Sequence, residues 1–343
     1  MNKKKIIKIV AEIVLILLMG FILYRLFRDS YKDIGRQLAN AKIQILLLLL
    51  LLGNLYYVID SIMYYYLFRK EGYRISFFRC LAIGYMCIFF NVTTFGAGIK
   101  PAQVMYLRTK GVDMGKAISI TTMPYVFHKT LIVIYAVVLL IINNSFVKNS
   151  FPSAIKYIYL GVGLSLVVIV GMILVGASEK FHNLLAKLTD RIFRKEKHRN
   201  VNAGIKNLMS NLRESTKDIV KDPKAWIIFS FTNFIKMSCW YVIPVIAIYA
   251  TGGNPGGVTI SQAITTTAIM QLIMGVIPTS GGVGSLEVVY ALVFAAVFGK
   301  TAAGSSLILY RVVTYYAPFL ISILILAPAG RDMRRGGKLD KHQ

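Results

Sequence analysis

Cysteine and acidic residues are both scarce in this sequence. The three cysteines, Cys80, Cys87 and Cys239, stand alone within apolar stretches. Such isolated positions support neither a disulfide framework nor a CxxC metal site, so we expect small core residues. His128 has no second metal ligand at a suitable spacing, and the sequence has no P-loop for ATP. We therefore expect no cofactor and no catalytic residue.

The shortage of acids leaves a large positive charge. The chain has 15 Asp and Glu residues against 40 Lys and Arg, which gives a formal charge of +25 at pH 7. In a soluble protein this excess would favour nucleic acid as a partner. Here the basic residues collect at the ends of apolar runs and in loops, where they orient membrane helices and contact anionic lipid. We expect membrane phospholipid as the partner and no nucleic acid.

Apolar runs make up much of the remaining sequence, and 56% of all residues are hydrophobic. About 20 apolar residues form one helical crossing of a bilayer. The first run, 6–27, has no small-residue cleavage site behind it and is read as a retained helix. The sequence therefore predicts an all-α integral membrane protein, a polytopic helical bundle with crossings that include residues 43–68, 116–142, 155–175, 226–250 and 303–327.

Basic segments predict the orientation of the chain. Residues 179–224 contain twelve Lys and Arg against six acids, and the tail at 331–343 and the N-terminus are also basic. The positive-inside rule places all three in the cytoplasm. We expect one transmembrane domain over residues 1–330, in which halves 1–178 and 225–330 flank an amphipathic linker on the inner leaflet.

Counting the crossings leaves two apolar stretches that must return to the side from which they start. Residues 258–299 begin and end outside and are broken at "IPTSGGVGS", whereas residues 77–111 begin and end inside, with a break at 90–101. Two opposed re-entrant hairpins satisfy this count and form an inverted repeat, a plan common in transporters. The basic loop 24–42 is the one exception to the positive-inside rule, since this topology leaves it outside the cell.

The breaks and the charges in apolar runs define the candidate site. Irregular backbone at membrane depth must be buried or line a cavity; its free N–H groups favour phosphate, and intramembrane charges are functional candidates. Each candidate also has a structural alternative to a binding role. The glycines could serve close helix packing, and Glu287 and Arg311 could form an ion pair. Lys129 and Lys236 could snorkel to the membrane surface, and Asp60 could form a polar contact between helices. The candidate headgroup contacts are Lys100, Gln103, Lys129, Lys236, Thr279, Ser280, Gly281, Gly282, Gly284, Glu287, Arg311 and Tyr315.

Three ordered motifs, "FNVTTFGAGIKPAQVMYLRTKG", "GVIPTSGGVGSLEVVY" and "LYRVVTYYAPFLI", resemble the lysylphosphatidylglycerol synthase transmembrane, or flippase-like, family. The likeness extends over about residues 5–330. The family's TPGxxGxxE pattern is matched at Thr279, Gly281, Gly284 and Glu287, with Ser280 in place of the proline.

The resemblance implies a bacterial inner-membrane flippase for an anionic or aminoacylated phospholipid such as lysyl-phosphatidylglycerol. Such a protein lowers sensitivity to cationic antimicrobial peptides. Relatives also carry a soluble aminoacyl-tRNA-dependent transferase, which we do not expect in a chain that ends at Gln343. A lysyltransferase component that works with a separate catalytic chain and a small-solute transporter remain alternatives, and a homo-oligomer is left open.

Overall fold

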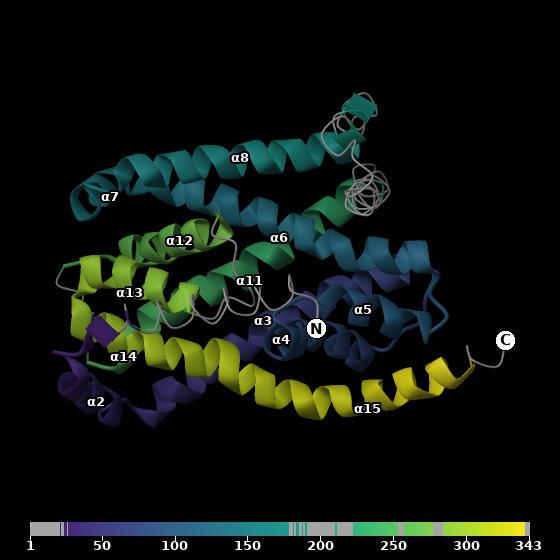
Figure 1. Ribbon diagram of the computed structural model, residues 1–343, viewed down its shortest axis with the longest axis horizontal. Coiled ribbons are helices and arrows are strands. Elements are labelled where there is room, and N and C mark those ends of the chain that lie inside the picture. Colours follow the sequence, from purple (N-terminus) through teal and green to yellow (C-terminus); the bar gives the residue numbers. More distant parts are fainter. Residues whose placement is uncertain are drawn as a thin grey trace, which may run out of the picture.

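The computed structural model describes residues 27–177, 222–252, 257–276 and 284–339, together with single positions within 21–25 and 181–190 and at 210. Every element in these ranges is helical (Figure 1). The expected first helix and most of the basic linker at 179–224 lie outside the described residues. So do Thr279, Ser280, Gly281 and Gly282.

The helices begin and end close to the predicted apolar runs. The first half contains α2 (Tyr31–Ala39), α3 (Ile43–Lys70), α4 (Phe77–Thr94), α5 (Ile99–Arg108), α6 (Met114–Ile142), α7 (Asn144–Ser150) and α8 (Ile155–Ala177). The second half contains α11 (Pro223–Ala250), α12 (Ile260–Val276), α13 (Ser285–Phe298), α14 (Lys300–Arg311), the π-helical turn η2 (Val312–Tyr316) and α15 (Ala317–Leu339).

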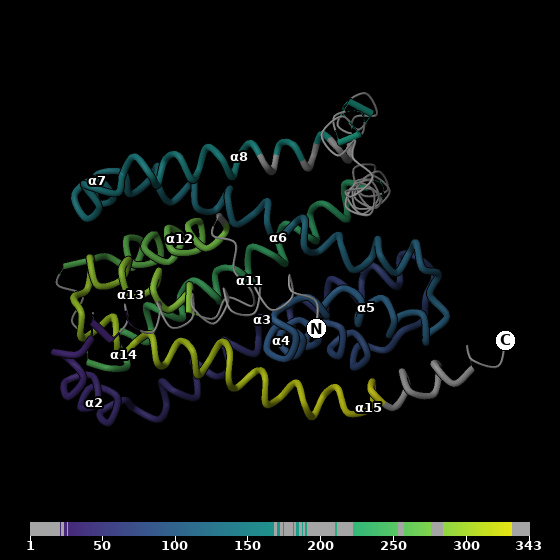
Figure 2. Tube along the Cα trace, viewed as in Figure 1, coloured from purple at the N-terminus to yellow at the C-terminus, as the bar shows by residue number. Residues whose placement is uncertain are grey.

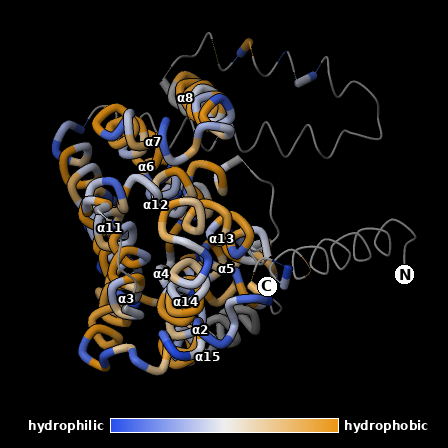
Figure 3. Tube along the Cα trace, turned by 90° about the vertical axis from the view of Figure 1, so that its left-hand side faces the viewer, coloured by the Kyte–Doolittle hydropathy of each residue, from blue (hydrophilic) through white to orange (hydrophobic). Residues whose placement is uncertain are grey.

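The described part of the chain is an all-helical membrane protein, as predicted. Helices α3, α4, α6 and α11, together with the continuous segment Lys300–Gly330, are long and apolar enough to cross a bilayer. Most of the helical trace is hydrophobic (Figure 3). Apolar segments form helices here because, where water is absent, intrahelical hydrogen bonds satisfy the N–H and C=O groups of the backbone within one segment.

The long helices run side by side, and the short ones occupy opposite ends of the bundle (Figures 1 and 2). Helices α4 and α5 lie toward the end at which α15 finishes, whereas α12 and α13 lie toward the other end, beside α14. The most extensive contact between two helices joins α3 to α11. This contact connects the first half of the chain to the second and brings their interior side chains together.

An ion pair at one end of the α3–α11 contact fixes its register. Asp222, the N-cap of α11, accepts a hydrogen bond from the Ala225 backbone N–H at 3.1 Å and pairs with Lys70 at 2.9 Å. The Lys70 ammonium group and this N–H hold the pKa of the Asp222 carboxyl below its usual range. The end of α3 is thereby joined to the start of α11.

Two glycines allow the long helices to approach closely. A Cβ atom on Gly53 of α3 would collide with the Val313 carbonyl oxygen of η2. A Cβ on Gly84 of α4 would lie 2.7 Å from Ser61 Oγ and 3.0 Å from the Tyr57 carbonyl oxygen of α3. Small residues of this kind let membrane helices pack by van der Waals contact, since lipid provides no hydrophobic force between them.

Substituting Gly53 tests this close packing. Gly53→Ala places a methyl group against backbone that cannot rotate away, so we expect a loss of about 1–3 kcal/mol of stability. Thermal unfolding of purified protein in detergent measures the loss. Gly161→Ala in α8 is the matched control, because a Cβ there meets nothing within 4 Å. Equal midpoints for the two variants would contradict the packing.

Candidate functional site

A buried ion pair lies at the centre of the α3–α11 contact. Lys236 Nζ of α11 donates to Asp60 Oδ1 of α3 at 2.7 Å, and the two side chains are 1% and 12% exposed. Neither charge is stable alone in a low-dielectric interior, because the desolvation penalty amounts to several kcal/mol per ion. The pair therefore requires α3 and α11 to be neighbours at this depth.

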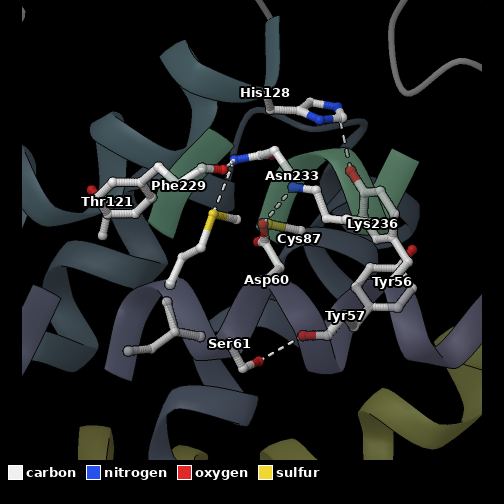
Figure 4. Close-up of polar contacts among 12 residues, drawn as sticks. Tyr56, Tyr57, Asp60, Ser61, Cys87, Thr121, His128, Phe229, Asn233 and Lys236 are labelled. Carbon is white, nitrogen blue, oxygen red and sulfur yellow. Dashed lines mark hydrogen bonds and ion pairs between the residues drawn. The ribbon is translucent and has the colours of Figure 1, made fainter. Parts of the chain in front are cut away.

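Aromatic and imidazole groups surround this pair (Figure 4). The Tyr56 ring centroid lies 4.9 Å from Lys236 Nζ, a cation–π contact. The Tyr56 hydroxyl and His128 Nε2 of α6 are 3.4 Å apart, so the donor depends on the imidazole tautomer. Three helices thus meet around one ammonium group.

Gln103, predicted as a headgroup contact, is fully buried between α4 and α5. Its Nε2 donates to the Ile83 carbonyl oxygen at 3.0 Å and approaches Cys87 Sγ at 3.4 Å. These contacts hold α5 against α4. In the described structure Gln103 positions the helix that carries Lys100.

A second ion pair joins three more of the predicted site residues. Arg311 Nη2 lies 2.5 Å from Glu287 Oε1, and the Arg311 guanidinium carbon is 4.9 Å from the Tyr315 ring centroid. Glu287 also accepts a hydrogen bond from the Gly284 backbone N–H at 2.7 Å. Gly284 has a φ of 83°, a conformation that glycine adopts without strain. The break before α13 and the start of η2 are thereby connected.

Lys100 and Lys129 differ from these paired charges. Both ammonium groups lie near the ring of Tyr125, at 5.8 and 5.7 Å from its centroid. Lys100 donates to the Thr121 carbonyl oxygen. No carboxylate of the described residues forms an ion pair with either lysine. Tyr125 is 50% exposed, so the cluster borders the outside of the helix bundle.

Lys129 lies in the middle of a helix long and apolar enough to cross a bilayer, and Lys100 lies at the start of a short helix beside it. Lys129 follows Met114, the first residue of α6, by fifteen positions, or about 22 Å at 1.5 Å per residue. Lys100 is the second residue of α5, directly after a tight turn in which Phe95 has a φ of 51°. A bulky residue rarely adopts a positive φ, so this conformation of Phe95 marks a constrained turn.

The described residues combine buried ion pairs with lysines that have no carboxylate partner. They contain no group of three or more His, Cys, Asp or Glu side chains that could hold a metal ion. They do contain two neutralised charge pairs and two lysines near the surface of the bundle. Such charges inside membrane proteins mark substrate or ion pathways.

Asp60, Tyr56 and Tyr125 were not among the candidate contacts predicted from the sequence. A signal for the first was present: Asp60 is the one charged residue within 43–68, and Lys236 is the one charged residue within 226–250. Two opposite charges, each isolated in its own apolar run, favour one another as partners. The tyrosines gave no comparable signal, since aromatic residues are common near membrane helix ends.

Fold and site together define a polytopic helical membrane protein with buried charges. The chain belongs to the family of lysylphosphatidylglycerol synthase transmembrane regions, whose family model matches residues 9–322. It is therefore a membrane protein of the lysylphosphatidylglycerol pathway. No curated protein matches the chain.

A double-mutant cycle tests the buried pair. Asp60→Asn or Lys236→Met alone leaves one unpaired buried charge, and we expect each to lose about 3–5 kcal/mol of stability. The double variant removes both charges and is expected to recover most of this loss. Unfolding midpoints of the four proteins in detergent provide the cycle. Additive losses would show that the two charges do not interact.

Proposed function

We propose that this protein is a bacterial inner-membrane flippase that moves an anionic or aminoacylated phospholipid such as lysyl-phosphatidylglycerol between leaflets. Transport of the lysylated lipid would contribute to resistance to cationic antimicrobial peptides. The observation that carries the proposal is the cluster of Lys100, Lys129 and Tyr125, in which two lysines have no carboxylate partner among the described residues. Family membership supports the same pathway.

The physical argument concerns the lipid phosphate. A charged phosphodiester cannot cross hydrocarbon unaided, because its desolvation is very costly. Two ammonium groups at membrane depth replace water with charge-assisted hydrogen bonds, which are stronger than bonds between neutral groups. The acyl chains can stay in the bilayer, since Tyr125 lies at the outer surface of the bundle.

The proposed topology has α4–α5 and α12–α13 as opposed re-entrant hairpins of an inverted repeat, with both termini in the cytoplasm. Helices α5 and α13 contain 10 and 14 residues, or about 15 and 21 Å, which is shorter than the roughly 30 Å hydrocarbon core. Their positions toward opposite ends of the bundle support this arrangement (Figure 1). The second break would add the Thr279 and Ser280 hydroxyls and the Gly281 and Gly282 backbone.

Lipid transport in proteoliposomes tests the function. We expect wild-type protein to move labelled phosphatidylglycerol and its lysylated form faster than protein-free vesicles do. Lys100→Gln and Lys129→Gln should each slow transport about tenfold, the value of one charge-assisted hydrogen bond. Lys156→Gln, at an exposed position at the start of α8, is the matched control. Wild-type transport at the protein-free rate would overturn the flippase.

Cysteine labelling tests the hairpin at α4–α5. In a chain whose three natural cysteines are replaced by alanine, Arg74→Cys precedes α4 and Arg108→Cys ends α5; both positions are exposed. A re-entrant hairpin places both on one membrane face, so an impermeant maleimide should label both in inside-out vesicles only. Labelling from opposite faces would mean that α4 crosses the bilayer completely.

A further inference from the structure

A cavity with a largely aromatic lining and several polar groups lies in the interior of the bundle, with His128 of α6 in its wall. It has a volume of about 180 Å³, which is space for about six water molecules at roughly 30 Å³ each. Its walls come from α3, α6, α11, α12, α13 and α14. The polar and aromatic residues that line it are Tyr56, His128, Trp240, Tyr241, Gln271 and Tyr310.

Three polar atoms of this wall, His128 Nδ1 and the hydroxyls of Tyr241 and Tyr310, lack a hydrogen-bond partner within the described protein. All three atoms are buried, and Tyr241 is 1% exposed. Buried polar groups in proteins are nearly always hydrogen-bonded. Tyr241 Oη and His128 Nδ1 can both accept a hydrogen bond when His128 carries its proton on Nε2, facing the Tyr56 hydroxyl. The cavity is therefore built to contain a hydrogen-bond donor.

The chemistry of the lining residues indicates which kind of hydrogen-bond donor the cavity can bind. The described lining residues include no Lys, Arg, Asp or Glu, so neither an anion nor a cation would find an opposite charge in the wall. Their aromatic rings instead attract cations, and Tyr56 already contacts the Lys236 ammonium group in this way. The neighbouring charges Lys236 and Arg311 are neutralised by Asp60 and Glu287.

The cavity and the lysine cluster share one turn of α6. His128 lines the cavity, whereas the next residue, Lys129, lies beside Tyr125. Successive helical residues point about 100° apart, so one molecule can contact both sides of the helix. Seating a phosphate near Lys129 would also balance the positive charge of the residue that follows His128 in α6.

We propose that this cavity binds the primary ammonium group of a phospholipid headgroup whose phosphate is held by Lys100 and Lys129. The site rests on the proposed function and gives it a specificity element. Tyr241 Oη and His128 Nδ1 accept hydrogen bonds from the ammonium group, and Gln271 belongs to the same wall. A lipid without an amine would use the phosphate contacts alone.

Trp240 reports directly on the cavity. The chain has two tryptophans, and Trp226, which makes an edge-to-face contact with Phe127 at a centroid distance of 4.9 Å, does not line the cavity. In Trp226→Phe protein the fluorescence therefore comes from Trp240. Water-soluble dihexanoyl lysyl-phosphatidylglycerol and dihexanoyl-phosphatidylglycerol are titrated into this protein in detergent. We expect a saturable change in emission with tighter binding of the lysylated lipid.

Two tyrosine variants of the reporter protein decide the outcome. Tyr241→Phe removes one acceptor and should weaken binding of the lysylated lipid about tenfold without changing that of phosphatidylglycerol. Tyr135→Phe is the control, since its hydroxyl contacts Ser238 at 3.3 Å outside the cavity. Equal effects of Tyr241→Phe on both lipids, or no saturable response to the lysylated lipid, would overturn the ammonium site.

The transport assay separates this proposal from the flippase itself. Proteoliposomes that move both lipids equally well with wild-type and Tyr241→Phe protein would retain the flippase and remove the ammonium site. If the protein binds the lysylated lipid through Tyr241 but moves neither lipid, the ammonium site is supported and the flippase function is contradicted.

Discussion

The salt bridge between Lys236 and Asp60 is the contact on which the arrangement of the helices depends. It joins residues 176 positions apart in the sequence, in the middle of the two helices that contact each other most extensively. A charge in hydrocarbon without its partner costs several kcal/mol, so α3 and α11 are restricted to one relative depth. Tyr56 extends from this pair to His128 and so connects it to α6.

The charges within the helix bundle fall into two classes. Lys236 and Arg311 are each neutralised by a carboxylate from another helix. Lys100 and Lys129 instead contact a carbonyl oxygen and an exposed tyrosine ring, and no described carboxylate pairs with them. The first class stabilises the fold, and the second can attract an anion from the bilayer. This division separates residues that shape the site from those proposed to hold the lipid.

Much of the site could be predicted residue by residue, and the ion pair weighed for Glu287 and Arg311 is present in the structure. Intramembrane charge alone identified Lys100, Lys129, Lys236, Glu287 and Arg311 as candidates. Gln103 Nε2 joins α5 to α4, whereas its Oε1 has no hydrogen-bond partner among the described residues, so its role as a headgroup contact stays a prediction. The sequence marks Asp60 and Lys236 as isolated opposite charges, but it does not show that α3 and α11 lie side by side, which their ion pair requires.

The sequence by itself determined where the helices lie, because each helix satisfies its backbone within a single segment and its apolar length is set by the bilayer. It also identified the two glycine-rich breaks at which this regularity stops. Only the tertiary structure decided that Asp60 meets Lys236 and that side chains from six helices enclose a cavity beside His128. Those outcomes depend on side chains from distant helices sharing a low-dielectric interior, where each unpaired group must find its partner in space.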